Sequence, residues 1–142
     1  MEYVPLGRSG LNVSRICVGT AVFGVAPLEQ EVDGIIGRAI ELGVNFFDTA
    51  DCYGNQEQFD RPTAPPAAQR KPAEELLGRA LGKNRDNVII ASKVSESVGS
   101  GPNDGGRSGT GLSRFRIMRQ VEASLRRLQT DRIDVYYAHR PD

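Results

Sequence analysis

Apolar positions along this 142-residue chain alternate between helical stripes and short continuous runs. Each stripe repeats at the i, i+3, i+4 spacing that places side chains on one helical face. The stripes predict three helices and comprise Val32, Ile35, Ile36, Ala39 and Ile40; then Leu76, Leu77, Ala80 and Leu81; then Ile117, Met118, Val121, Leu125 and Leu128. Gly43 and Gly82 follow the first two stripes as helix ends.

Between the stripes lie four short apolar runs, which predict buried strands at residues 15–20, 44–48, 87–93 and 132–140. Because the runs are continuous rather than alternating, they are typical of parallel strands covered by helices. A hairpin around residues 8–10 is predicted before the first of them. The chain is therefore expected to form one α/β domain over residues 1–142.

Two loops interrupt this alternation. Residues 54–71 carry Pro62, Pro65 and Pro66 and are long for a connection between a strand and a helix. Residues 97–111 are rich in glycine and are predicted to be mobile. A phosphate-binding role for Gly99-Ser100-Gly101 is disfavoured, because the spacing is not GxGxxG and no helix follows directly.

Length and composition narrow the alternatives. A complete (β/α)8 barrel needs roughly 250 residues, so length alone favours a doubly wound sheet. The 18 basic and 18 acidic side chains balance, which argues against a nucleic-acid partner. No apolar stretch approaches the roughly 20 residues of a membrane helix, and the start lacks the features of a signal peptide. Cys17 and Cys52 match no metal spacing, so a reducing cytoplasm is the simplest setting.

Polar residues end or follow three of the predicted strands. Asp48 ends the second strand, Lys93 the third and His139 the fourth, while Tyr53 follows Asp48 by five residues. Parallel strands bring such residues to one edge, where barrel enzymes keep their active sites. An ammonium beside a phenol makes its hydroxyl a better acid, and a paired carboxylate holds the ammonium in place. We therefore expect Tyr53 to protonate a carbonyl oxygen while another group delivers hydride to carbon.

The remaining polar residues are interpreted structurally. Asp51 is expected to form a turn, Cys17 to lie in the core, and Cys52 to be a small packed residue rather than a redox-sensitive thiol. His139 is the one histidine of the sequence, which argues against a multi-histidine metal site. A solvated helix face, rather than a cofactor phosphate site, is expected for Arg114, Arg116, Arg119, Arg126, Arg127 and Arg132.

Several stretches resemble the aldo/keto reductase family. FFDTADCYG is similar to the family segment with the catalytic Asp and Tyr, IIASK to its Lys strand, and DRIDVYYAH to its His strand. GRSGLNVSRICVGT, VEASLRRLQTDRIDVYYAHRPD, and GPND followed by LSR resemble one branch of the family. That branch includes sugar-aldehyde and ketone reductases and the potassium-channel β subunits.

The resemblance implies a fold and a function. It implies the N-terminal half of a (β/α)8 barrel, in place of the doubly wound sheet that length favours. The implied activity is the reduction of small aldehydes, ketones or sugar carbonyls with hydride from NADPH, with Tyr53 as general acid. The implied catalytic residues are Asp48, Tyr53, Lys93 and His139, and the implied cofactor contacts are Thr20, Ala21 and Asp48.

Other functions stay open at this stage. The family's adenosine-phosphate clamp comes from later strands, and Ala21 stands where the family often has an aromatic residue. A non-catalytic subunit that regulates a membrane channel, and an inactive half-barrel, are the alternatives. Four parallel strands without closure leave two open edges, so self-association is also expected.

Overall fold

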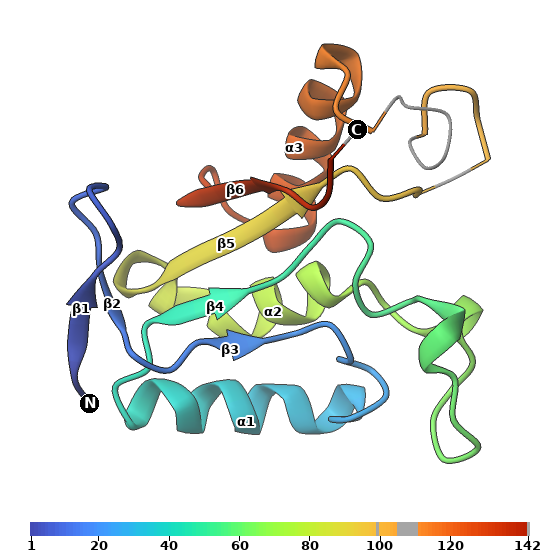
Figure 1. Ribbon diagram of the computed structural model, residues 1–142. Helices are drawn as coiled ribbons and strands as arrows, with labels where there is room; N and C mark the ends of the chain where they lie inside the picture. Colours follow the sequence, from blue (N-terminus) through green and yellow to red (C-terminus); the bar gives the residue numbers. More distant parts are fainter. Residues whose placement is uncertain (99, 105–110, 142) are drawn as a thin grey trace.

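The computed structural model describes residues 1–98, 100–104 and 111–141, and it is an α/β structure (Figure 1). Four parallel strands form a sheet in the order β3-β4-β5-β6. The strands are β3 (Val18–Gly19), β4 (Phe46–Asp48), β5 (Ile89–Val94) and β6 (Val135–Ala138). The helices are α1 (Glu29–Glu41), α2 (Ala73–Leu81) and α3 (Arg114–Leu128). The predicted alternation is confirmed, although each strand is shorter than its apolar run.

The predicted N-terminal hairpin is present as the antiparallel pair β1 (Tyr3–Pro5) and β2 (Asn12–Ser14). It lies at the end of the sheet where the strands begin (Figure 1). The Tyr3 hydroxyl donates to the Gly43 carbonyl at 2.9 Å, and the Ser14 amide donates to Asn45 Oδ1 at 2.7 Å. The hairpin therefore closes this end, and the loops at the opposite end remain open to form a site.

The hydrophobic core lies between one face of the sheet and the helices. Its members come from the α1 and α2 stripes, from the strand residues that point towards them, and from the end of α3. The largest fully buried apolar side chains are Phe47, Ile36, Leu76, Leu77, Leu81, Ile90, Leu128 and Val32. Helices that cover one sheet face are the arrangement expected of βα units.

Helix α3 turns a different face to the core than its apolar stripe predicts. Arg116 and Ser124 are fully buried, whereas Phe115 and Met118 are 60% and 47% exposed. The solvated face predicted for the arginines is therefore wrong for Arg116. The reason is that buried carboxylates lie beneath this helix, and a buried charge needs a partner of opposite sign.

The first apolar run is also less buried than predicted. Cys17 is exposed rather than part of the core, and Ile16 is 59% exposed. Both precede the short strand β3, which lies at one edge of the sheet.

The predictions for residues 97–111 fall partly on residues 99 and 105–110, which lie outside the described residues. No helix within the described residues has the length and apolar character that crossing a membrane requires.

The contact between α2 and α3 gives a test of this packing. A Cβ added at Gly78 would lie 2.4 Å from the backbone oxygen of Leu128, whereas one added at Gly34 in α1 meets nothing within 4 Å. Gly78→Ala is expected to lower the free energy of unfolding by roughly 1–3 kcal/mol through overpacking. Gly34→Ala, the matched control, should raise it by roughly 0.5–1 kcal/mol. Urea unfolding measures both, and equal stability of the two variants would contradict the packing of α2 on α3.

Candidate active site

Strand register places three of the predicted site residues on one face of the sheet. Asp48 is in register with Ala91, two residues before Lys93, and Lys93 is in register with Tyr137, two residues before His139. Side chains two residues apart on a strand point to the same side. Asp48, Lys93 and His139 therefore project from the face opposite the helices, where the strands end.

Tyr53 reaches the same place through a tight turn. Its amide donates to the Ala50 carbonyl at 3.2 Å, and its own carbonyl accepts from the Ala73 amide at 2.9 Å. Gly54 follows with φ +94°, and a Cβ there would lie 2.5 Å from the Ala73 nitrogen. Only glycine suits this conformation and this close approach. The turn is thus tied to the first residue of α2, which fixes the position of the tyrosine.

The four side chains form a continuous chain of contacts. Lys93 Nζ donates to Asp48 Oδ1 at 2.5 Å and to the Tyr53 hydroxyl at 3.3 Å. The Tyr53 hydroxyl lies 3.4 Å from His139 Nε2, and the two rings meet edge-on with centroids 5.5 Å apart. The 3.3 Å and 3.4 Å distances to the Tyr53 hydroxyl lie at the long end of the range for hydrogen bonds. The structure therefore brings together all four residues that the sequence predicts to be catalytic. We call Asp48, Tyr53, Lys93 and His139 the tetrad.

The surroundings hold His139 in its neutral form. Burial, followed by the nearby Lys93 ammonium, lowers the pKa of His139 below its ordinary value of 6.5. A neutral imidazole has one donor and one acceptor nitrogen. His139 can therefore share a hydrogen bond with the Tyr53 hydroxyl or with a carbonyl oxygen near neutral pH.

Cys52 lies next to the tetrad and contacts His139. Its Sγ lies 3.9 Å from His139 Nδ1 and accepts from Gln56 Nε2 at 3.3 Å. Burial raises the pKa of the Cys52 thiol to about 12. The thiolate is the reactive form of cysteine, so this shift supports a packed residue rather than a redox-sensitive one.

The predicted cofactor contacts lie in three different settings. Thr20 is fully buried; its amide donates to the Asp48 carbonyl at 3.0 Å, and its hydroxyl has no hydrogen-bond partner among the described residues. Asp48 holds Lys93. Ala21 borders a cavity of about 310 Å³ at the tetrad. This cavity is lined by Ala21, Tyr53, Gln56, Gln58, Phe59, Glu96, His139 and Arg140.

Buried charges behind the tetrad were missed by the sequence analysis. Asp51 lies in the predicted turn, but its carboxylate is buried 3.5 Å from the guanidinium of Arg116, which also donates to the Glu96 carbonyl at 2.7 Å. Fully buried Glu74 accepts from Ser92 and Arg127. A second signal was present, because Arg116, Gln120, Ser124 and Leu128 also follow i, i+4 spacing.

The buried Asp51 gives a prediction about pH. Burial raises its pKa from 3.8 to about 7, against the opposing charge of Arg116, with Glu74 and Glu96 adding to the rise. A carboxyl group with a raised pKa in the folded state loses its stabilising contribution as the pH rises from about 4 through 7. Relative to Asp51→Asn, the wild type should therefore lose roughly 2–3 kcal/mol of unfolding free energy between about pH 5 and pH 8. Urea unfolding of both proteins measures this difference, and a difference independent of pH would contradict it.

Comparison with known proteins identifies the family of this chain. The model of the aldo/keto reductase family matches residues 15–142. The chain belongs to the aldo/keto reductase family. Members of this family are oxidoreductases that act on small-molecule carbonyl compounds and generally use NAD(P)H.

Individual relatives are similar over nearly the whole chain. An uncharacterised oxidoreductase, YrpG of Bacillus subtilis, is 41% identical over 145 residues, which cover 100% of this chain and 41% of the relative. A probable voltage-gated potassium channel subunit beta of Oryza sativa subsp. japonica is 38% identical over 146 residues, which cover 100% of this chain and 38% of the relative. A putative aldo-keto reductase structure from Pseudomonas aeruginosa superposes with a TM-score of 0.73 at 34% identity, covering 97% of this chain and 46% of that one.

The share of each relative that this chain covers shows that it corresponds to only part of their fold. The chain spans less than half the length of the relatives it matches. Its parallel sheet and alternating helices correspond to part of the aldo-keto reductase barrel. The predicted half-barrel is confirmed over the doubly wound sheet that length alone favoured.

Proposed function

We propose that the protein reduces small aldehydes, ketones or sugar carbonyls with hydride from NADPH, and that Tyr53 is the general acid. The observation that carries this proposal is the position of the Tyr53 hydroxyl, 3.3 Å from Lys93 Nζ and 3.4 Å from His139 Nε2. It borders the cavity at the tetrad, where a carbonyl oxygen can approach it. A general acid acts within hydrogen-bond reach of its proton acceptor, roughly 2.6–3.2 Å, so the carbonyl oxygen would take up such a position beside the Tyr53 hydroxyl.

Each residue of the tetrad has a separate task in this proposal. Tyr53 donates its proton to the carbonyl oxygen as negative charge develops there. The Lys93 ammonium stabilises the phenolate that remains, and Asp48 holds that ammonium in place through the 2.5 Å contact. Neutral His139 donates a hydrogen bond that orients the same carbonyl oxygen. The site is partly buried, which strengthens each of these electrostatic interactions.

The described residues fit the reacting end of a nicotinamide cofactor. Ala21 has a small side chain on the cavity wall beside Tyr53 and His139, so a flat ring can approach the tetrad there. When bound, the cofactor would supply the hydride. Asp48 and the Thr20 backbone, which are joined by a hydrogen bond, would border it. The one arginine on this cavity wall, Arg140, is ion-paired with Glu96.

A second candidate function is a subunit that regulates a channel, as the name of the Oryza relative suggests for that protein. Steady NADPH-dependent turnover of a small aldehyde by the purified protein separates the two. Multiple turnovers are expected, with loss of NADPH equal to alcohol formed. Association with a channel without turnover would favour the regulatory function, and neither result would favour an inactive half-barrel.

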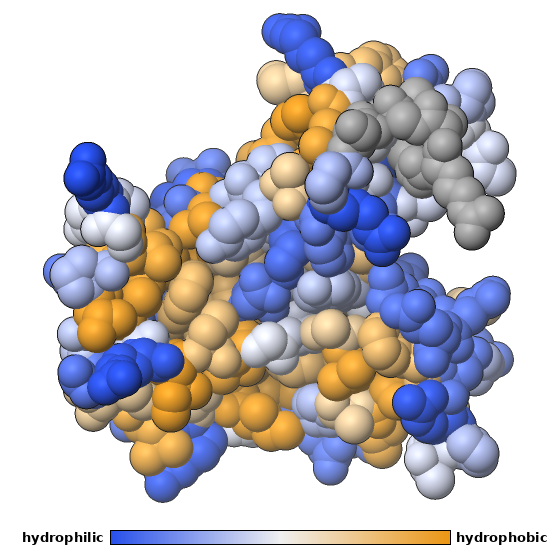
Figure 2. Space-filling view, viewed as in Figure 1, coloured by the Kyte–Doolittle hydropathy of each residue, from blue (hydrophilic) through white to orange (hydrophobic). Residues whose placement is uncertain are grey.

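We further propose that residues 1–142 form the N-terminal portion of a single barrel domain, and that these residues taken alone self-associate through the edges of their sheet. Strands β3 and β6 are the edges of the sheet. Apolar side chains are spread over the face shown in Figure 2, and Ile16 and Tyr137 are 59% and 42% exposed. Exposed strand edges and apolar surface favour association.

A cytoplasmic location is also proposed. Cys17 and Cys52 are both free thiols in this structure. Unpaired thiols persist most readily in a reducing compartment.

A further inference from the structure

Backbone hydrogen bonds join the three segments that carry Tyr53, Lys93 and His139. The Asp51 amide, in the turn before Tyr53, donates to the Lys93 carbonyl at 3.2 Å. On the other side of β5, the His139 amide donates to the Val94 carbonyl at 2.8 Å. The relative positions of the three side chains therefore depend on how the turn after β4 and the segment after β5 are held.

Arg116 reaches both of these segments from helix α3. Its side chain is fully buried; its Nη2 donates to the Glu96 carbonyl at 2.7 Å and lies 3.5 Å from Asp51 Oδ2. Ser113 is the N-cap of α3, and its hydroxyl oxygen accepts from the Arg116 amide at 3.2 Å. A single guanidinium, fixed at the first turn of a helix, thus contacts the turn after β4 and the segment after β5 together.

Glu96 extends the contact to the third segment. Its carboxylate is ion-paired with Arg140, the residue after His139. The neighbouring Ser95 hydroxyl donates to the Arg140 carbonyl at 3.3 Å. Ser95 has φ +136°, a conformation that is costly for a residue with a side chain and persists only where surrounding contacts hold it. The bond from Arg116 to the next carbonyl is one of those contacts.

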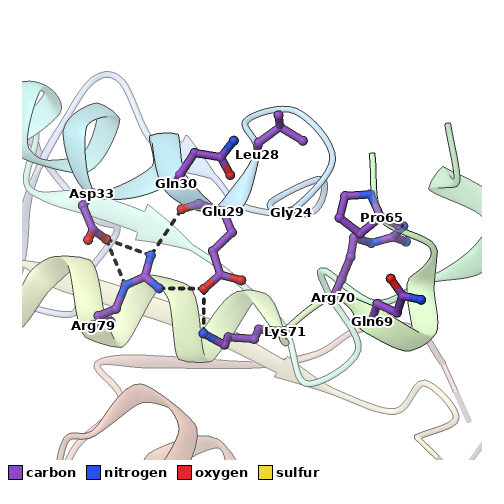
Figure 3. A pocket seen from close by; sticks show the side chains of 10 residues that line it. All are labelled: Gly24, Leu28, Glu29, Gln30, Asp33, Pro65, Gln69, Arg70, Lys71 and Arg79. Atoms are coloured by element: carbon purple, nitrogen blue, oxygen red, sulfur yellow. Dashed lines mark hydrogen bonds and ion pairs between the residues drawn. The ribbon is translucent and has the colours of Figure 1, made fainter. Parts of the chain in front are cut away.

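Arg116 is poorly bonded for a buried arginine. Its Nε and Nη1, and Oδ1 of Asp51, have no hydrogen-bond partner among the described residues. Figure 3 shows a contrasting arginine beside a cavity of about 500 Å³ between α1 and α2, where every nitrogen of Arg79 is bonded to Glu29 or Asp33. Incompletely satisfied buried charges add little to stability, because desolvation offsets their attraction. Such departures from good packing are typical of functional sites.

We propose that Arg116 is a positioning residue, which places the Tyr53 hydroxyl for proton transfer by holding the turn after β4 against the segment after β5. This inference rests on the proposed reductase function. Arg116 does not line the cavity at the tetrad, so it acts through the backbone of the two segments and not on the substrate. Proton transfer depends steeply on geometry, and a misplacement of about 1 Å can lower a rate by roughly 10²-fold.

The test replaces both charges at once, with Arg116→Met and Asp51→Asn in one protein, so that neither charge is left unpaired in the interior. Removal of a complete buried ion pair often leaves stability unchanged. The urea midpoint of unfolding should therefore stay close to that of the wild type. The kcat for a small aldehyde should fall by roughly 10²-fold while KM changes little, because the cavity wall is untouched.

Arg127→Met is the matched control, since Arg127 lies on the same helix and pairs with the fully buried carboxylate of Glu74, away from the turn that carries Tyr53. This variant leaves a buried carboxylate without its counter-charge, so its urea midpoint should fall. Its kcat should stay close to that of the wild type. Stability and activity are thus expected to change in opposite ways in the two proteins, which a merely structural role of Arg116 would not produce.

The NMR resonances of His139, the one histidine of the sequence, report the geometry without cofactor or turnover. The Tyr53 ring meets the imidazole edge-on with centroids 5.5 Å apart, so its ring current contributes to the shifts of the imidazole protons. Tyr53→Leu provides the shifts without that ring. The resonances of the double variant should move towards those of Tyr53→Leu, and those of Arg127→Met should stay at the wild-type positions.

Arg116→Lys provides a second variant that keeps the buried charge. One ammonium cannot replace the planar fork of a guanidinium, so the His139 resonances should move in the same direction by a smaller amount. Unmoved resonances in both Arg116 variants, or equal movement in Arg127→Met, would overturn the inference, as would a wild-type kcat in the double variant.

These outcomes are separate from the outcome of the proposed function. Turnover that depends on Tyr53, with His139 resonances that do not respond to Arg116, would leave the reductase function standing and remove the positioning role. Resonances that respond to Arg116 in a protein without turnover would remove the reductase function and leave the structural link between α3 and the tetrad.

Discussion

Tyr53→Phe is expected to lower kcat for aldehyde reduction by roughly 10²- to 10⁴-fold, the usual contribution of general acid catalysis. The substitution removes the hydroxyl that lies between Lys93 Nζ and His139 Nε2 and keeps the aromatic ring. Because the ring still packs against His139 edge-on, the fold of the turn should persist. The loss should therefore appear in kcat rather than in stability.

Steady-state kinetics with a small aldehyde and NADPH measure this effect. Tyr137→Phe is the matched control, since Tyr137 lies on the same sheet face but does not line the cavity at the tetrad. Its kcat should stay close to that of the wild type. A Tyr53→Phe variant with wild-type kcat would show that another group supplies the proton.

Lys93→Met is the second substitution with a large expected effect. It removes the ammonium that contacts Asp48, Tyr53 and the Thr49 carbonyl. We expect kcat to fall by at least roughly 10²-fold, because the phenolate formed by proton transfer loses its counter-charge. The pKa of His139 should rise at the same time, since the Lys93 ammonium contributes to lowering it.

Two measurements follow Lys93→Met, namely kcat and the pH titration of the His139 ring resonances by NMR. Lys83→Met is the control, because Lys83 is exposed in the 3₁₀ segment Gly82–Asn87, which precedes β5 at the opposite end of the sheet from the tetrad. An unchanged pKa of His139 in Lys93→Met would contradict the electrostatic contact. A lowered pKa would contradict its sign.

The tetrad could be predicted from sequence because alternate residues of a strand point to the same face of the sheet. Asp48, Lys93 and His139 need only lie in register on parallel strands to share one face, and short apolar runs are enough to place those strands. The Gly54 turn could be anticipated from its composition. Its close contact with Ala73 could not, because that contact joins two segments only in the folded chain.

The orientation of α3 could not be read from its apolar residues. Periodicity counts apolar side chains along one helix and carries no information about the charges beneath it. The carboxylates of Asp51 and Glu74 are buried there, and they draw the side chains of Arg116 and Arg127 inward. A pattern based on hydrophobicity alone therefore selected a face whose residues, apart from the buried Leu128, are half-buried or exposed.

Loop 54–71 marks a similar limit. Its prolines predicted an irregular segment, and the structure contains two short 3₁₀ helices there, Glu57–Phe59 and Ala67–Gln69. The residue that organises it is Arg70, which binds three backbone carbonyls. Bonds to backbone atoms cannot be inferred from a pattern of residue types, so the position of this loop could not be predicted from the sequence.

The most direct test of the central claim follows the hydride itself. NADPH that carries deuterium at the transferred position is mixed with the protein and a small aldehyde, and the alcohol is analysed by mass spectrometry and NMR. The account predicts one deuterium on the carbinol carbon of the wild-type product and a strongly reduced rate of its formation with Tyr53→Phe. An alcohol without deuterium, or the same rate for both proteins, would contradict the assignment of this site.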